Sequence, residues 1–197
     1  RLRGELSDKQ YAERIESIKR FERQLTDNGY LVLKLFFQIG KKEQKKRLEE
    51  LEGKKDTAWR VGENDWWQNK HYDKCEEVYD KYLTDTNASV APWYIIDSGD
   101  KKWAELQVLE TLCSGIHVAM QNERLAVPIL QNVFPLVKMP KLSEVELDKE
   151  ISEEEYKKEL RHLQKKLNAL HYRLYRKKIP VVIAYEGWDA AGKGGNI

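Results

Sequence analysis

A short glycine-rich segment near the end of the chain has the residue types and spacing of a phosphate-binding loop. Gly187, Gly192 and Lys193 satisfy the pattern G-x-x-x-x-G-K directly after the apolar run 181–185. The pattern is specific in this position, between a strand and the expected start of a helix. Glycines let the backbone curl so that N–H groups point at phosphate oxygens, and the lysine adds a positive charge. The predicted phosphate contacts are Gly187, Ala190, Ala191, Gly192, Lys193, Gly194 and Gly195.

The final position of this pattern departs from the commonest phosphate-binding loop. Gly194 stands where a serine or threonine would offer a hydroxyl to magnesium. Asp189 lies inside the loop, and a hard cation prefers carboxylate oxygen. We therefore expect Asp189 to bind Mg²⁺, although an aspartate here could instead only stabilise the turn. Asp189 and Lys193 are the predicted catalytic residues.

The segment before the loop predicts a long helix followed by a buried strand. Ser152 and Glu155 form a capping-box signature, leucines then alternate four and three residues apart, and Pro180 ends the pattern. The basic residues 173–178 at the end of this helix suit the negative pole of a helix dipole, so nucleic-acid binding is not required.

The first part of the chain predicts an alternation of strands and helices, which indicates an α/β fold. Residues 41–56 are so rich in charge that they predict an exposed helix, broken at Gly53. Trp59, Trp66 and Trp67 are interpreted as packing anchors rather than base-stacking platforms. The expected elements are a strand at 30–39, helices within 41–83, a strand at 92–97 and a helix at 100–120.

Composition excludes several classes of protein. Among the 197 residues, 35 Lys and Arg nearly balance 33 Asp and Glu, so the total charge indicates no nucleic-acid partner. Cys75 and Cys113 lack the spacing of a zinc site or a disulfide framework. No apolar run approaches the ~20 residues of a membrane helix, and we expect a cytoplasmic protein.

The sequence EGWDAAGKGG at Glu186–Gly195 resembles the opening of a polyphosphate kinase 2 domain. The resemblance implies that Gly194 follows the family pattern, that Gly187, Gly192 and Lys193 contact phosphate, and that Asp189 ligates magnesium or assists catalysis. Residues 1 to about 120 resemble the other half of such a domain, including a helical lid and a final strand in APWYIIDSGDKKWAEL.

The resemblance therefore covers nearly the whole chain, but in the order second half, linker, first half. It implies a P-loop kinase-like parallel sheet flanked by helices, with a helical lid, in a helix-rich α/β protein. We expect a piece of a tandem protein of the polyphosphate:AMP phosphotransferase type. The predicted parts are the end of a first unit at 1–123, with its strand at 30–39, lid at 41–83, strand at 92–97 and helix at 100–120, a linker at 124–150, and the start of a second unit at 151–197.

Several positions of the first unit depart from the family pattern. Ala58, Gly62, Trp103 and Glu105 stand where the resemblance implies polar or basic residues. These losses predict that the first unit is degenerate and structural. The second acidic motif of the family is not found in these residues, so activity is expected of a longer parent protein.

The predicted function is Mg²⁺-dependent transfer of a phosphoryl group between inorganic polyphosphate and AMP or ADP. An ATP-dependent nucleotide or small-molecule kinase and an inactive structural or dimerisation module are the alternatives. The expected partners are polyphosphate, a nucleotide and a second copy of the chain, with no nucleic acid and no membrane.

Overall fold

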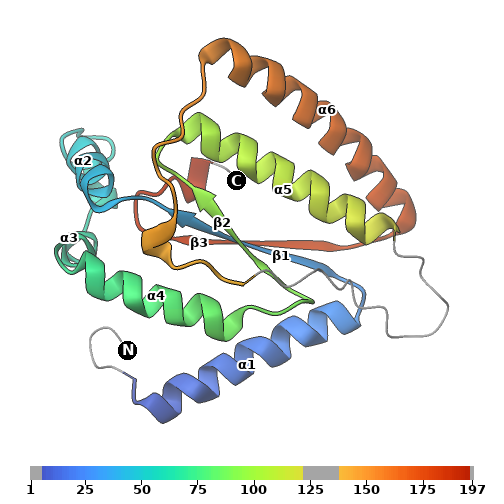
Figure 1. Ribbon diagram of the computed structural model, residues 1–197, viewed down its shortest axis with the longest axis horizontal. Helices are drawn as coiled ribbons and strands as arrows, with labels where there is room; N and C mark the ends of the chain where they lie inside the picture. Colours follow the sequence, from blue (N-terminus) through green and yellow to red (C-terminus); the bar gives the residue numbers. More distant parts are fainter. Residues whose placement is uncertain (1–5, 122–137, 196–197) are drawn as a thin grey trace.

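The computed structural model describes residues 6–121 and 138–195. Its centre is a parallel sheet of three strands in the order β2, β1, β3 (Figure 1). β1 (Leu31–Gln38) is buried along its whole length, as its almost continuous apolar sequence predicts for a central parallel strand. β2 (Trp93–Asp97) pairs with it on one side and β3 (Val181–Gly187) on the other.

Helices cover both faces of this sheet. They are α1 (Asp8–Asp27), α2 (Lys41–Glu52), α3 (Glu63–Lys70), α4 (Tyr72–Thr86), α5 (Lys101–Gln121) and α6 (Glu153–Lys177), with short 3-10 turns at Ala58–Arg60, Leu142–Glu144 and Lys193–Gly195. In Figure 1, α5 and α6 lie on one face, and α1 and α4 on the other. The short helices α2 and α3 lie beside the carboxyl ends of the strands. The predicted parallel sheet flanked by helices is therefore confirmed.

Strands from both predicted units share this one sheet. β3 follows α6 in the predicted second unit, and it pairs with β1 from Leu31 opposite Val181 to Phe37 opposite Gly187. The division of the chain into two units stays a prediction. Every described helix is too short or too polar to cross a lipid bilayer.

The predicted linker at 124–150 lies partly outside the described residues. Its described part carries the turn Leu142–Glu144, and Leu142 is only 1% exposed. The Leu142 N–H donates to Asp80 of α4 at 2.7 Å. This part of the segment therefore packs against the core.

Two expectations about exposure are wrong. α2 ends before Gly53 as predicted, but Gln44 and Arg47 on its inner face are buried. Their polar ends have partners, which makes their burial possible. Trp59 is 77% exposed, so it is not a packing anchor.

One ion pair explains the lysine inside the apolar strand β1. Lys34 Nζ lies 2.8 Å from Glu22 Oε1 of α1 and donates to the Thr86 carbonyl at 2.7 Å. Both residues are buried. A buried charge is tolerated when it is paired and hydrogen-bonded in this way, and the pair connects α1 and the end of α4 to the sheet.

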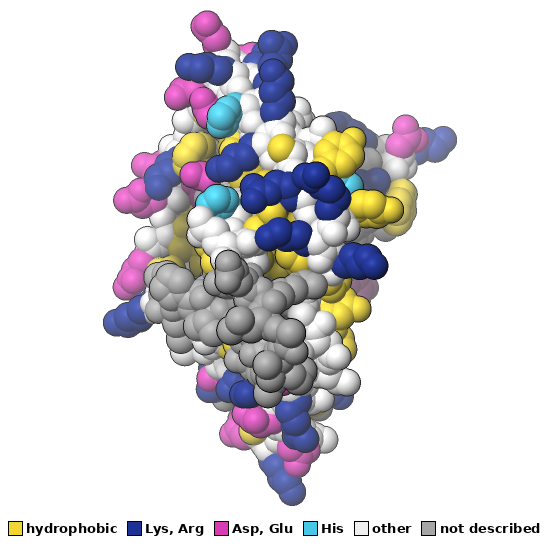
Figure 2. Space-filling model, turned by 90° about the vertical axis from the view of Figure 1, so that its right-hand side faces the viewer, with side chains coloured by type: hydrophobic (Ala, Val, Ile, Leu, Met, Phe, Trp, Pro, Cys, Tyr) yellow, Lys and Arg dark blue, Asp and Glu magenta, His cyan; other side chains and the backbone are white. Residues whose placement is uncertain are grey.

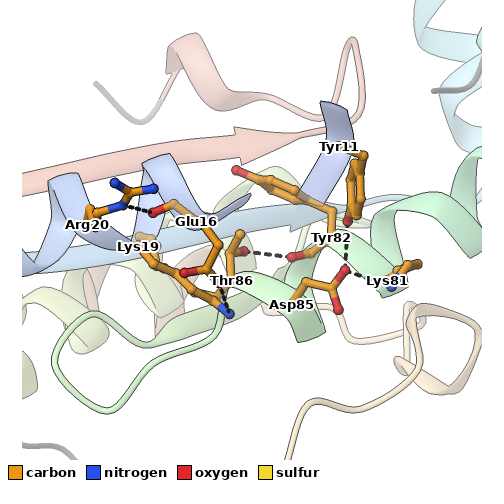
Figure 3. A network of polar contacts seen from close by, with 9 residues as sticks. Tyr11, Glu16, Lys19, Arg20, Lys81, Tyr82, Asp85 and Thr86 are labelled. Atoms are coloured by element: carbon orange, nitrogen blue, oxygen red, sulfur yellow. Dashed lines mark hydrogen bonds and ion pairs between the residues drawn. The ribbon is translucent and has the colours of Figure 1, made fainter. Parts of the chain in front are cut away.

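A polar network joins α1 to α4 on the same face (Figure 3). The Tyr11 hydroxyl donates to Asp85 Oδ2 at 3.0 Å, and Lys81 Nζ donates to the same oxygen at 2.8 Å. Burial raises the pKa of Asp85, but the hydrogen bonds from Lys81 and Tyr11 outweigh it, so its pKa lies below the usual value.

We expect Tyr11→Phe to lower the free energy of unfolding by about 1 kcal/mol at pH 7, because it removes one hydrogen bond to a carboxylate. Folding lowers the pKa of Asp85. The stability that its carboxylate contributes is therefore fully present above about pH 3.9, the ordinary pKa of an aspartate, and is lost as the pH falls through the folded pKa. Urea unfolding at pH 7 and at pH 3 measures both effects. Tyr175→Phe is the control, because Tyr175 is 80% exposed. Equal stability of Tyr11→Phe and the unsubstituted protein at pH 7 would contradict the prediction.

Candidate active site

The glycine-rich loop begins where β3 ends, beside the carboxyl end of β1. Gly187 has φ +142°, and a Cβ atom built there would lie 2.4 Å from the Phe37 carbonyl oxygen. Only glycine allows the two backbones to approach so closely. The approach fixes the starting point of the loop against the central strand.

The loop itself is held in a curled conformation. Ala190 and Gly192 have φ values of 63° and 93°. Glycine adopts such a conformation at little cost, whereas alanine does so only when its surroundings hold it there. The Ala191 N–H donates to the Trp188 carbonyl at 3.2 Å, and the Gly195 N–H donates to the Gly192 carbonyl at 3.1 Å. Two donors of the predicted phosphate cradle are thus engaged inside the loop in this conformation.

Lys193 points back into the loop that carries it. Its Nζ donates to the carbonyl oxygens of Gly187 at 2.7 Å and Trp188 at 2.8 Å. Burial lowers its pKa, which the negative charge of Asp189 partly opposes. A phosphate group in the loop would offer this ammonium a charged acceptor in place of neutral carbonyls, and such hydrogen bonds are roughly twice as strong.

Asp189 faces a second carboxyl group from another element. Burial, and then the hydrogen bond and charge of Asp65 on α3, raise the pKa of Asp189 to about 6, while Lys193 and Gln68 oppose the rise. Within residues 6–121 and 138–195, no group of three or more His, Cys, Asp or Glu side chains could hold a metal ion. The Oε1 atom of Gln68 is buried and has no hydrogen-bond partner in this part of the chain. The carboxyl groups of Asp65 and Asp189 therefore meet here, and the Gln68 amide donates a hydrogen bond to Asp189.

A cavity of about 960 Å³ opens over the loop. Of the predicted site residues it brings together all but Gly187, which ends β3 against Phe37. Side chains from α2, the segment 53–62, α3 and α5 complete the walls. The loop residues are Asp189, Ala190, Ala191, Gly192, Lys193, Gly194 and Gly195, and the charged residues from the other elements are Arg47, Glu50, Lys54, Arg60, Asp65, Lys101, Lys102 and Glu105.

Arg47 and Gln44 are site residues that sequence reasoning missed. Arg47 donates to the carbonyls of Ser98 and Gly99 at 2.8 Å and reaches the Ala190 carbonyl at 3.5 Å. Gln44 accepts from Asn69 of α3 at 2.9 Å and approaches the Asp189 carbonyl at 3.5 Å. The only signal was their spacing with Leu48 on one face of a charged helix.

The basic residues at the end of α6 lie at the opposite end of the molecule from the glycine-rich loop. Figure 2 shows the side to which this helix end points, where lysine and arginine side chains gather. Residues 173 and 176–178 are exposed there. β3 separates this helix end from the loop by 7 residues, or about 23 Å at the usual rise of a strand. The cluster is therefore not part of the cavity.

Comparison with known proteins finds similarity to the polyphosphate kinase 2 family and to polyphosphate phosphotransferases. A sequence model of the polyphosphate kinase 2 family matches residues 1–124 and 150–197. The chain is 30% identical over 201 residues to a polyphosphate:AMP phosphotransferase of Pseudomonas aeruginosa, covering 100% of this chain and 40% of that relative.

Two further relatives have related names. A polyphosphate:AMP phosphotransferase of Pseudomonas syringae is 32% identical over 200 residues, covering 100% of this chain and 40% of the relative. An AMP/ADP-polyphosphate phosphotransferase of Meiothermus ruber is 31% identical over 103 residues, which cover 52% of this chain and 38% of that relative. The chain thus spans about 40% of the length of the Pseudomonas relatives.

Proposed function

Because the chain belongs to the polyphosphate kinase 2 family, we propose that the protein moves a phosphoryl group between inorganic polyphosphate and a nucleoside mono- or diphosphate. The observation that carries this proposal is the cavity over the loop, where Lys193 and cations from α2, the segment 53–62 and α5 line one space. A chain of phosphates has one negative charge or more at each unit, and several converging cations are the complement it requires. The names of the relatives support polyphosphate and AMP or ADP as the substrates.

In this proposal the protein acts mainly by positioning and by stabilising charge. Lys193 leaves its own loop carbonyls and binds phosphate oxygens, and the loop N–H groups that remain available complete the cradle. Arg60 and Lys101 face the same cavity from two other elements, so they can hold neighbouring phosphates of the donor or the acceptor. Arg47, which also lines the cavity, contacts the loop at the Ala190 carbonyl.

The residues present fit a magnesium ion beside the loop. Asp189 and Asp65 would supply carboxylate oxygens, the ligands that a hard cation prefers. When bound, magnesium neutralises phosphate charge during transfer. Carboxyl groups that face each other repel when both are ionised, so Asp65 and Asp189 have a physical reason to favour a cation between them.

We also propose a cytoplasmic location, which accords with the buried free thiols of Cys75 and Cys113. A homo-oligomer is the expected assembly. That the first predicted unit is degenerate and only structural stays a hypothesis. Glu105, one of its departures from the family pattern, lies in the cavity wall and accepts a hydrogen bond from Tyr156 of α6.

The donor test for this function uses the full-length protein with magnesium, long-chain polyphosphate and either AMP or ADP. We expect ADP or ATP to accumulate, as measured by anion-exchange chromatography, and no product without polyphosphate. ATP in place of polyphosphate, with AMP as acceptor, is the parallel reaction. Transfer from ATP alone would identify an ordinary nucleotide kinase and overturn the proposal, and absence of transfer from either donor would favour a structural module.

A further inference from the structure

The side chain of Trp188 is completely buried although it belongs to the phosphate-binding loop. Its ring stacks on that of Tyr72, with centroids 4.2 Å apart and an interplanar angle of 7°, and meets Tyr79 edge-on at 4.8 Å. Tyr72 begins α4 and Tyr79 lies two turns further along it. The indole therefore inserts between the end of β3 and the start of α4.

A hydrogen bond fixes the rotation of this indole. Trp188 Nε1–H donates to Gln38 Oε1 at 2.6 Å. Gln38 is the last residue of β1, and its amide in turn donates to the Tyr72 hydroxyl at 3.1 Å. The Tyr72 hydroxyl donates to the Ile39 carbonyl at 2.7 Å. Each of the side chains of Trp188, Gln38 and Tyr72 thus contacts the other two, and together they form a cluster at the carboxyl end of the central strand.

The backbone of Trp188 connects this cluster to the groups that are predicted to bind phosphate. Its carbonyl oxygen accepts from both the Lys193 ammonium at 2.8 Å and the Ala191 N–H at 3.2 Å. Its C-terminal neighbour is Asp189. A rotation of the Trp188 peptide would displace all three groups together, and displacements of about 1 Å in an active site can reduce a rate by about a hundredfold.

We propose that Trp188 is a positioning residue, whose indole is held by Gln38 and Tyr72 so that Lys193 and Asp189 meet the phosphate in a fixed geometry. This inference rests on the proposed function, since it concerns the same loop. It assigns the buried aromatic residue a role in binding and rate in addition to its contribution to packing.

The test compares two tryptophans that make similar contacts in different places. Trp93 on β2 is also buried, its Nε1–H donates to Thr86 Oγ1 at 2.9 Å, and its ring meets Tyr82 edge-on at 5.9 Å. Trp93→Phe and Trp188→Phe in the full-length protein therefore remove the same atoms and one hydrogen bond each. Trp188→Leu additionally removes the ring that stacks on Tyr72.

The melting temperature of each variant is measured first. The Kd for inorganic tripolyphosphate, by calorimetry, and kcat with polyphosphate are then measured well below that temperature. We expect Trp188→Phe and Trp93→Phe to lower the melting temperature by similar amounts. Only Trp188→Phe should weaken tripolyphosphate binding severalfold and lower kcat about tenfold, and Trp188→Leu should have the larger effect on both.

The outcomes separate the inference from the proposed function. Equal changes in Kd and kcat for Trp93→Phe and Trp188→Phe would reduce Trp188 to a packing residue and overturn the inference. If Trp188→Leu fails to fold, Trp188→Phe decides alone. A wild-type protein that binds tripolyphosphate without transferring phosphate would contradict the proposed function, and the binding data would still test Trp188. A wild-type protein that binds no tripolyphosphate would overturn both.

Discussion

Replacing Lys193 with alanine is expected to reduce phosphoryl transfer by the full-length protein about a thousandfold, or ~4 kcal/mol in activation free energy. The ammonium donates to the Gly187 and Trp188 carbonyls, and Lys193 lines the cavity over the loop. It pairs with phosphate before and during transfer, so its loss weakens binding as well as rate. We expect the Kd for tripolyphosphate to rise at least tenfold in the same variant.

Two companion variants make this prediction specific. Lys165→Ala removes an exposed lysine of α6 and should leave both quantities unchanged. Lys193→Arg keeps the charge, but the planar guanidinium cannot replace a compact ammonium between two carbonyl oxygens, so most activity should still be lost. Steady-state kinetics and calorimetry measure these effects. Retention of more than a tenth of the activity in Lys193→Ala would contradict the assigned role.

The loop could be predicted from the sequence because its signal is local. The glycine spacing, the preceding apolar strand and Lys193 are all contained in a short continuous stretch. The structure adds the physical reason for Gly187, whose missing Cβ allows β3 to approach the Phe37 backbone. That contact joins segments far apart in the chain, so no local pattern reports it.

The walls of the site could not be predicted in the same way. Arg47 belongs to a helix with many charges, and the sequence does not show which of its cations turns inward. Its burial depends on carbonyls of Ser98 and Gly99, which follow a different strand. Asp65 likewise reaches Asp189 only because α3 packs over the carboxyl ends of the strands. Such residues are selected by tertiary packing, which sequence periodicity does not contain.

Trp188 is an intermediate case. A large aromatic residue inside a glycine-rich loop is an unusual local feature, and it signals that the loop has a buried side. The partners of this side chain come from the end of β1 and the start of α4. The sequence could therefore indicate that Trp188 is buried, whereas only the fold shows what holds it.

Asp189→Asn is expected to lower kcat about a hundredfold, on the order of 3 kcal/mol, while leaving metal-free phosphate binding intact. Gly194 has no hydroxyl to offer a cation, so the carboxylate of Asp189 would have to carry much of the magnesium site. Asparagine keeps the size of the side chain and the turn preference of the loop, but it removes the charge. Tripolyphosphate binding without magnesium should be unchanged or slightly tighter, because a negative charge near the phosphates is gone.

A direct measurement of metal binding separates this role from a purely structural one. Mn²⁺ titrated into the protein and followed by electron paramagnetic resonance should bind at least tenfold more weakly in Asp189→Asn. Asp65→Asn should shift binding in the same direction by a smaller factor, because Asp65 approaches the site from α3 and also accepts from the Gly62 N–H at 2.7 Å. Glu146→Gln is the matched control, since it removes an exposed carboxylate outside the cavity. Wild-type Mn²⁺ affinity and wild-type magnesium dependence of kcat in Asp189→Asn would exclude the carboxylate as a metal ligand and leave it the turn-stabilising role that its position in the loop also permits.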